Sequence, residues 1–330
     1  MKKTTLISIC MVIIVLFAAN LMAQTADLGK KLFDAGKFPQ RVGNTDKISF
    51  LHFHKDADGK TAQDLVVGNI KTGEFEYFSL DLPEEPRMGT IAWKKDGSGL
   101  AVARKDLSLC DIYEYSAEKP FKITKLTDLV PFVTDYDSAF KAQLHVEDYM
   151  LLSVTYLDWS PDGKQLAFNL VKVTKGAVWV LDTESGRMRQ VTKDNFGGSP
   201  VWANDNKTLY IAAGGNSSGV ESQDIFSVNT EDLTVTPVIA TPAMELYPHV
   251  SPDGNFIAYT YRERNKQQTI YVYDIKNKKS AQLVTLGAAG SCVYPTWAGD
   301  GKSVIYQYVG PESIFPAIYQ KDFSPDIFKK

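Results

Sequence analysis

Short apolar segments separated by polar turns recur along most of this chain. One unit appears five times: an aromatic or apolar residue, a polar turn that contains Asp, and a run of apolar and β-branched residues. The five copies read WKKDGSGLAVA from Trp93, WSPDGKQLAF from Trp159, WANDNKTLYIA from Trp202, VSPDGNFIAY from Val250 and WAGDGKSVIY from Trp297. Strand-like segments flanking a turn of Asp, Gly, Asn and Pro predict a β-hairpin in each copy.

The spacing of the copies predicts how the hairpins are organised. The turn aspartates are Asp96, Asp162, Asp205, Asp253 and Asp300, at intervals of 66, 43, 48 and 47 residues. Three of these intervals match one four-stranded blade of a β-propeller. Two further strand-like segments follow the hairpins, and a first blade with a degenerate hairpin begins at Ile48. The sequence therefore predicts an all-β fold, a six-bladed β-propeller of four-stranded antiparallel blades.

Each residue type in the unit has a structural task. The Trp positions are expected on inner strands, where a large flat side chain fills the wedge between neighbouring blades. In the turn, Asp accepts hydrogen bonds from its own backbone, and Gly takes the left-handed conformation. We therefore expect the Trp and Asp residues of the repeat to be structural.

The repeat also sets the expected boundaries. Residues 24–330 are predicted to form one propeller domain, with blades at approximately 38–85, 86–128, 151–193, 198–241, 245–287 and 291–330. The last blade shows no convincing fourth strand. Because an open sheet edge invites aggregation, we expect the segment around residues 31–37 to supply that strand and close the ring.

The first residues resemble an export signal. Lys2 and Lys3 precede an apolar run, and Ala23 is a suitable last residue before cleavage. An uncleaved membrane anchor is the alternative, and Asn20 near the end of the run weighs against it. We expect residues 1–23 to be removed and a monomeric mature protein to be periplasmic or secreted.

The composition limits the kinds of partner and ligand that we expect. The full chain has 36 Lys and Arg against 39 Asp and Glu, a net charge of −3, which gives no basic surface for nucleic acid. Cys110 and Cys292 fall in blades that do not touch, so both are expected to be buried thiols. Asp56 and Asp58 lie in a calcium-loop-like stretch that lacks the further ligands, so a polar turn is favoured. We expect no metal and no cofactor.

The WSPDGKQLAF and VSPDGNFIAY segments resemble the WD-like repeat of the TolB propeller, and the resemblance covers essentially the whole mature chain. TolB carries an α/β domain before its propeller, so this chain resembles the isolated TolB-like propeller. Similar repeats form the gating propeller of prolyl oligopeptidase-type enzymes, but the nucleophile elbow of such a hydrolase does not occur after Asp300. Oligogalacturonate lyases also carry similar repeats, and that resemblance implies several His ligands around an axial metal. The four histidines here are His52, His54, His145 and His249.

Ligands of propellers bind around the central channel, where loops enter the innermost strands. The candidate binding residues are therefore those just ahead of each repeat. They are Arg87, Tyr156, Asp158, Glu245, Tyr247, His249 and Tyr294. These aromatic and charged groups suit a sugar or a peptide, although Tyr and Pro at these positions also belong to the structural repeat.

The long 66-residue interval contains an insertion at approximately residues 128–152, between the second and third blades. Its apolar residues have near-helical spacing, and we expect it to cap the channel or to pack on the rim for stability. The polar and aromatic candidates within it are Asp135, Tyr136, Asp137 and Tyr149.

Together these features favour a non-catalytic exported propeller that recognises an envelope protein, a peptide or a glycan at the channel face. The alternative is an enzyme, a metal-dependent polysaccharide lyase or other hydrolase that uses the rim residues near His249. A purely structural or assembly role is a third possibility, since propellers host many functions.

Overall fold

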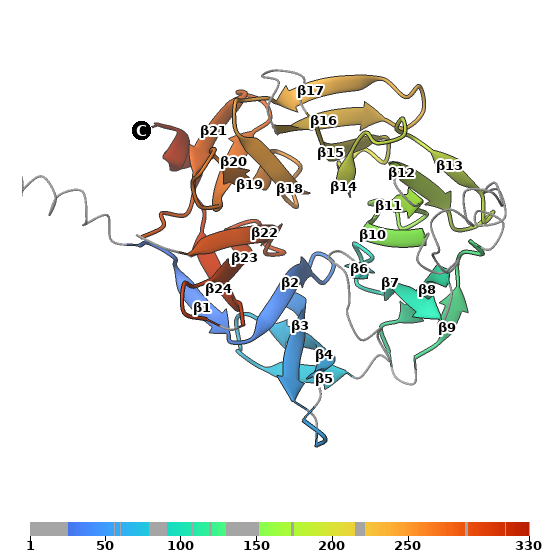
Figure 1. The fold of residues 1–330 in the computed structure, drawn as a ribbon, viewed down its shortest axis with the longest axis horizontal. Helices are drawn as coiled ribbons and strands as arrows, with labels where there is room; N and C mark the ends of the chain where they lie inside the picture. The colour runs from blue at the N-terminus through green and yellow to red at the C-terminus, as the bar shows by residue number, and fades with distance from the viewer. Residues whose placement is uncertain are drawn as a thin grey trace, which may run out of the picture.

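The computed structural model describes residues 26–55, 57–59, 61–78, 91–106, 109–118, 121–129, 152–172, 175–214, 222–287, 290–313 and 315–329. Figure 1 shows a ring of β-sheets, with the chain passing from one sheet to the next around a centre. The described strands form four four-stranded sheets and one eight-stranded sheet. The eight-stranded sheet is two four-stranded groups joined by one parallel pair, Gln223 with Met244. We number the resulting groups as blades 1 to 6.

The strands are named in chain order. Blade 1 contains β2 (Gly36–Arg41), β3 (Lys47–Lys55), β4 (Thr61–Asn69) and β5 (Phe75–Phe78), and blade 2 contains β6 (Ile91–Trp93), β7 (Gly99–Asp106), β8 (Leu109–Ser116) and β9 (Ile123–Lys125). Blade 3 contains β10 (Leu152–Trp159), β11 (Gln165–Lys172), β12 (Lys175–Asp182) and β13 (Met188–Gln190). Blade 4 contains β14 (Gly198–Trp202), β15 (Thr208–Gly214), β16 (Gln223–Asn229) and β17 (Val235–Ile239).

Blade 5 contains β18 (Met244–Val250), β19 (Phe256–Arg262), β20 (Thr269–Asp274) and β21 (Lys279–Gln282). Blade 6 contains β22 (Ser291–Trp297), β23 (Ser303–Val309), β24 (Ala317–Asp322) and β1 (Lys30–Phe33), and a 3-10 helix follows at Pro325–Lys329. Within each blade, neighbouring strands are antiparallel. The predicted all-β propeller of four-stranded antiparallel blades is confirmed.

The N-terminal segment closes the ring. β1 pairs antiparallel with β24 as the outermost strand of blade 6, so blue β1 lies beside red β24 in Figure 1. The predicted donor segment is thereby confirmed in its first part. Gly36 and Lys37, which the sequence assigned to the same segment, instead begin β2, the innermost strand of blade 1.

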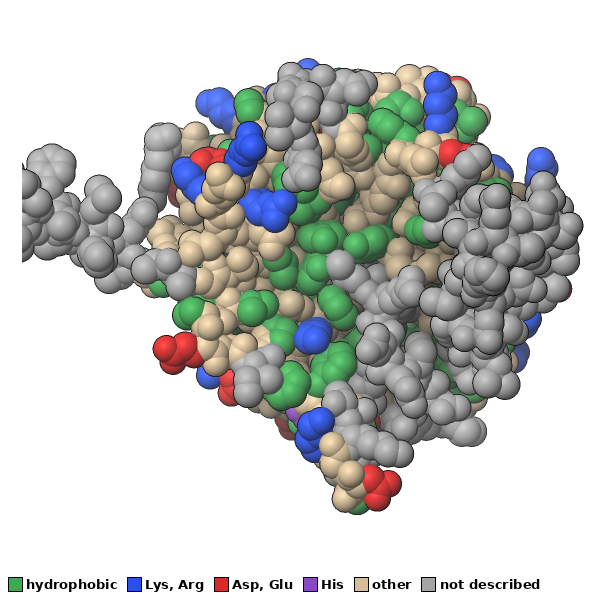
Figure 2. Space-filling model, viewed as in Figure 1, with side chains coloured by type: hydrophobic (Ala, Val, Ile, Leu, Met, Phe, Trp, Pro, Cys, Tyr) green, Lys and Arg blue, Asp and Glu red, His purple; other side chains and the backbone are tan. Residues whose placement is uncertain are grey.

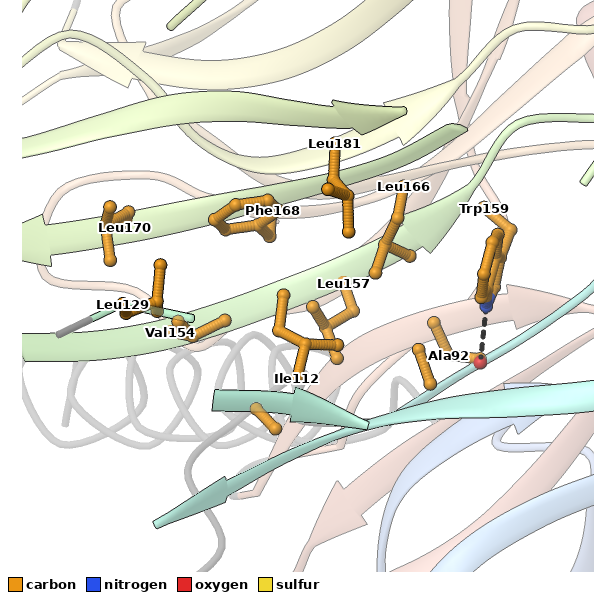
Figure 3. Packing of buried hydrophobic residues seen from close by; sticks show 12 residues of the cluster. Ala92, Ile112, Leu129, Val154, Leu157, Trp159, Leu166, Phe168, Leu170 and Leu181 are labelled. Atoms are coloured by element: carbon orange, nitrogen blue, oxygen red, sulfur yellow. Dashed lines mark hydrogen bonds between the residues drawn. The ribbon is translucent and has the colours of Figure 1, made fainter. Parts of the chain in front are cut away.

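The core lies between the blades. Six clusters of buried apolar side chains occupy the six interfaces between consecutive blades, including the one between blades 6 and 1. Figure 3 shows the cluster between blades 2 and 3, where Trp159 and Phe168 pack against Ala92 and Ile112. Each blade therefore buries both of its faces, which is why its strands are apolar on both sides.

The repeat unit does what its residues predict. The indole N–H of Trp159 donates to the carbonyl of Ala92 on the preceding blade, at 3.1 Å (Figure 3). Trp202 and Trp297 make the same type of bond to Asp158 and His249. In the turns, all five repeat aspartates accept the backbone N–H two residues later, in the pairs Asp96–Ser98, Asp162–Lys164, Asp205–Lys207, Asp253–Asn255 and Asp300–Lys302.

Several of the sequence-based expectations concern residues outside the described ranges. Residues 1–25, where the export signal is expected, are outside them, and so are Arg87 and the residues Asp135, Tyr136, Asp137 and Tyr149 of the expected insertion. The Cys292 thiol is buried and forms no disulfide. Among the described residues, no helix is long and apolar enough to cross a membrane.

Candidate functional site

A pocket opens on the axis of the ring, where the innermost strands meet. It is a cavity of about 80 Å³. Its lining comes from the innermost strands of five blades: Phe38, Pro39, Gln40, Tyr156, Leu157, Asp158, Ser199, Pro200, Val201, Tyr247, Pro248, His249, Tyr294 and Pro295. Figure 2 shows hydrophobic side chains gathered at the centre of this face, around the ends of β2, β18 and β22. A cavity of this size admits a few waters or the tip of a larger ligand.

One backbone feature recurs in five innermost strands. Phe38, Tyr156, Ser199, Tyr247 and Tyr294 all have a positive φ, between 49° and 56°. At each of them the pairing register with the next strand shifts, which marks a β-bulge. A positive φ is unfavourable for a bulky side chain, and bulges of this kind re-aim side chains next to functional sites. Here the five bulges place their side chains around one axial pocket.

The local sequence explains the repeated bulge. In four of the five strands Pro directly follows the bulged residue, as in Tyr247-Pro248 and Tyr294-Pro295. Pro has no N–H to donate to the neighbouring strand, so the hydrogen-bond ladder is already interrupted at this point. The signal in sequence is a bulky or polar residue followed by Pro, three residues ahead of the repeat anchor.

Four aromatic rings contact one another in this pocket. The ring centroids of Tyr247 and Tyr294 are 4.4 Å apart, those of Tyr156 and Tyr247 are 6.0 Å apart, and those of Phe38 and Tyr294 are 5.3 Å apart. We call Phe38, Tyr156, Tyr247 and Tyr294 the aromatic cluster. Burial raises the pKa values of Tyr156 and Tyr294, and the neighbouring Tyr247 adds to this effect. Both phenols therefore stay protonated at neutral pH.

The polar residues beside the aromatic cluster are engaged in joining blades. The carboxylate of Asp158 accepts from the backbone N–H of Trp202 at 2.7 Å and pairs with Lys95 at 2.7 Å. The ring of His249 lies 3.5 Å from the backbone nitrogen of Trp297, which donates to Nδ1. In the same way, Thr296 Oγ1 accepts from the backbone N–H of Arg41. Each of these side chains precedes a blade's anchor position and binds the anchor amide of the next blade.

Arg41 occupies the anchor position of blade 1, where four of the other five blades carry Trp and blade 5 carries Val250. Its side chain is buried, and its Nη1 has no hydrogen-bond partner among the described residues. Burial lowers the pKa of Arg41, an effect that the charge of Asp158 partly opposes. Burial lowers the pKa of Lys95 as well. We call Arg41, Lys95 and Asp158 the axial cluster: it contains two basic side chains and one carboxylate, so its net charge is positive.

His249 is neutral in this environment. Burial lowers its pKa well below the usual value, and the positive charges of Arg41 and Lys95 lower it further. Its Nε2 lies 3.3 Å from Thr296 Oγ1, so both ring nitrogens have partners. A catalytic histidine needs one nitrogen facing substrate, and this geometry gives His249 a structural role between blades 5 and 6.

The structure brings five of the seven predicted rim residues into one pocket: Tyr156, Asp158, Tyr247, His249 and Tyr294. Glu245 was predicted at the rim and is instead completely buried, with Thr241 donating to its Oε1. The reason is its position on β18 ahead of the bulge at Tyr247: there Glu245 lies between blades 4 and 5, close to Asp224 of blade 4, and does not point into the pocket. Burial raises the pKa of Glu245 to about 7.

Phe38 is the functional candidate that sequence reasoning missed. The first blade lacks the Asp-Gly turn and the Trp anchor, so Phe38-Pro39-Gln40-Arg41 did not stand out as an innermost strand. The signal that could have found it is the likeness of Phe38-Pro39 to Tyr247-Pro248 and Tyr294-Pro295, three residues ahead of the anchor.

Solved structures share this fold. A putative TolB from Agrobacterium tumefaciens is 14% identical with a TM-score of 0.57, covering 89% of this chain and 91% of that one. The β-propeller domain of the Trilobed protease from Pyrococcus furiosus is 12% identical with a TM-score of 0.57, covering 89% and 95%. An oligogalacturonate lyase in complex with manganese is 11% identical with a TM-score of 0.56, covering 90% and 93%.

At these identities the likeness shows the fold alone, and the neighbours include both TolB proteins and enzymes. The search of curated proteins finds no match. The family model of the TolB beta propeller domain matches residues 126–315, more than half of the chain. Together with the repeat and the ring of blades, this match shows that the chain belongs to the TolB β-propeller domain family.

Proposed function

We propose that this protein is a non-catalytic propeller that binds a protein, a peptide or a glycan, and that part of this ligand enters the axial pocket. The observation that carries the proposal is the aromatic cluster, whose four rings are set by strained bulges around one small cavity. Rigid aromatic side chains supply large contact area at low entropic cost, and they stack on sugar rings and on peptide side chains alike. The strain at the bulges is what a preorganised binding surface requires.

The polar surroundings of the pocket favour binding over chemistry. Besides the tyrosines of the aromatic cluster, the titratable groups in its lining are Asp158 and His249, and each of these two is held by the next blade's backbone. Among the described residues, no group of three metal-ligating side chains faces this pocket. The lyase alternative near His249 therefore has less support from geometry than the binding proposal.

The positive charge of the axial cluster favours some ligands over others. Arg41 and Lys95 outnumber Asp158 near the pocket, so the inserted part of the ligand is expected to be neutral or acidic, because a cation would meet repulsion. The small cavity volume implies that only the tip of the ligand enters, for example one side chain, a chain end or one edge of a sugar. The rest of the ligand would lie on the channel face.

A binding screen with pocket variants tests the proposal. Mature protein is applied to an oligosaccharide array and a random peptide library, and each hit is measured by isothermal titration calorimetry. Tyr247→Ala and Tyr294→Ala should each weaken binding by roughly 30-fold, about 2 kcal/mol, as for a buried aromatic anchor. Tyr271→Ala on β20 is the matched control, because Tyr271 is a half-buried tyrosine of blade 5 outside the pocket.

The outcomes separate the readings. Ligands that bind the pocket variants as well as they bind wild type would show that the axial pocket is not the binding site. Conversion of a bound oligosaccharide to product, with loss in His249→Gln, would favour the enzyme. Basic peptides that bind more tightly than acidic ones would contradict the charge preference.

The cellular setting is part of the proposal. We propose that the chain is exported after cleavage near Ala23 and acts as a monomer in the periplasm or outside the cell, where envelope proteins, peptides and glycans are available.

We also propose that the insertion at 128–152 adds contacts beside the channel. Deleting residues 130–148 should then weaken binding while the unfolding midpoint changes little, whereas a purely structural insertion would show the reverse.

A further inference from the structure

Three side chains of metal-ligating type come together on blade 1, away from the axial pocket. His52 and His54 are two residues apart on β3 and so point to the same face of the sheet. Asp64 on β4 lies directly opposite His52 in the strand register, which puts its side chain on that face too. One ligand atom from each of the three lies within 4.8 Å of the others. Sheet pairing has therefore built a cluster of two imidazoles and a carboxylate.

The hydrogen bonding of this cluster is incomplete. The Nδ1 atoms of His52 and His54 are both buried, and neither has a hydrogen-bond partner among the described residues. Oδ2 of Asp64 is 3.5 Å from Nδ1 of His54 without forming a hydrogen bond. Buried ring nitrogens are normally paired, and leaving them unpaired is unfavourable. A cation placed between these atoms would satisfy both nitrogens and the carboxylate together.

The surroundings hold the imidazoles in place. The two His rings are stacked, with centroids 5.7 Å apart and an interplanar angle of 16°. The His52 ring also packs edge-on against Phe33 of β1 and Tyr77 of β5. Since β1 closes the ring, the cluster lies at the outer end of the interface between blades 6 and 1. A ligand here would add a link between the β3–β4 hairpin and its neighbours.

We propose that His52, His54 and Asp64 form a binding site for a late first-row divalent cation such as Zn²⁺. Imidazole nitrogens with one carboxylate suit Zn²⁺, Ni²⁺ or Cu²⁺, whereas Ca²⁺ and Mg²⁺ prefer oxygen ligands throughout. Zn–N distances of about 2.0–2.1 Å require the ligand atoms to close in from their present separation. Side-chain exposures of 37% for His54 and 25% for Asp64 leave room for that rotation and for water as a further ligand.

Zn²⁺ binding by tag-free, metal-stripped protein tests this proposal. Isothermal titration calorimetry with ZnCl₂ should show one ion per chain, and the ion should raise the thermal unfolding midpoint. Co²⁺ added in place of Zn²⁺ should give visible absorption bands of a nitrogen- and oxygen-ligated site. His54→Gln and Asp64→Asn should each weaken Zn²⁺ binding at least about tenfold and reduce the Co²⁺ bands.

Glu76→Gln on β5 is the matched control, because it removes an exposed carboxylate from the same blade and lies outside the cluster. Circular dichroism of each variant checks that the propeller is folded. If His54→Gln does not fold, Asp64→Asn alone provides the test. Absence of stoichiometric Zn²⁺ binding, or equal affinity in wild type and both ligand variants, would overturn the proposal. Equal loss in Glu76→Gln would show general surface charge instead of a defined site.

Discussion

At the scale of single residues, environment overrides type in this protein. His249 and Asp158 are residues that often do chemistry, yet here each accepts a backbone N–H from the next blade. Glu245 is an acid that the sequence analysis placed at a solvated rim, yet packing between blades 4 and 5 buries it. The sequence indicates which side chains are near the axis. The direction in which each one points depends on the β-bulge that lies in the same innermost strand.

Glu245 makes stability depend on pH. Its pKa is about 7 in the folded protein against an ordinary 4.5. Between these values the folded state binds more protons than the unfolded state, so the contribution of Glu245 to stability falls as pH rises from 4.5 to 7. Glu245→Gln removes this dependence, so its stability relative to wild type should increase by about 3 kcal/mol across that range.

Urea unfolding of both proteins at pH 4.5, 6, 7 and 8 measures the difference. The comparison at each pH is necessary because His249, with its lowered pKa, acts in the opposite direction below pH 6.5. A constant difference between Glu245→Gln and wild type at all four pH values would rule out a titrating Glu245.

At the scale of elements, the repeated hairpin is the unit that holds the ring together. Its Trp fills the wedge between blades and donates to the preceding innermost strand, while its Asp closes the turn. These functions depend on residues close in sequence, which is why the hairpins and the blade period could be predicted. The first blade departs from the pattern: Arg41 stands at the anchor, and its strand escaped prediction for that reason.

Trp159 gives the test at this scale. It is completely buried between blades 2 and 3, and its loss leaves a cavity and removes the hydrogen bond from the indole to the Ala92 carbonyl. Trp159→Ala should lower the free energy of unfolding by about 3–5 kcal/mol. Ile123→Ala is the control, because Ile123 is 51% exposed and its truncation should change stability by less than about 0.5 kcal/mol. Urea unfolding followed by circular dichroism gives both values, and equal small effects would contradict the wedge role.

At the scale of the whole molecule, closure joins the two ends of the chain. β1 completes blade 6, and Phe33 of β1 packs against Phe50 and Phe75 of blade 1, with centroids 4.6 and 5.1 Å away. The axial pocket draws its lining from five blades, so it exists only while the ring is closed. The arrangement of the aromatic cluster depends on this closure, because its four rings come from four different blades.

Removing β1 tests the closure. A chain that starts at Asp34 exposes the edge of β24, and an exposed edge promotes pairing with other chains. This truncated chain should have a lower thermal midpoint and should form soluble aggregates in size-exclusion chromatography. A chain that starts at Ala26 keeps β1 and should remain monomeric, and matching behaviour of the two chains would show that β1 is dispensable.

The sequence by itself determined the fold class, the blade period, the role of the Trp and Asp repeats and the strand that closes the ring. Those features follow from local turn chemistry, from strand patterning and from the need to cover a sheet edge. Tertiary structure alone decided that five bulges meet at one pocket, that Glu245 is buried, and that His52 and His54 share a face with Asp64. Such contacts join residues that lie far apart in the chain or in different strands, and their geometry depends on strand register and ring closure, which no local pattern specifies.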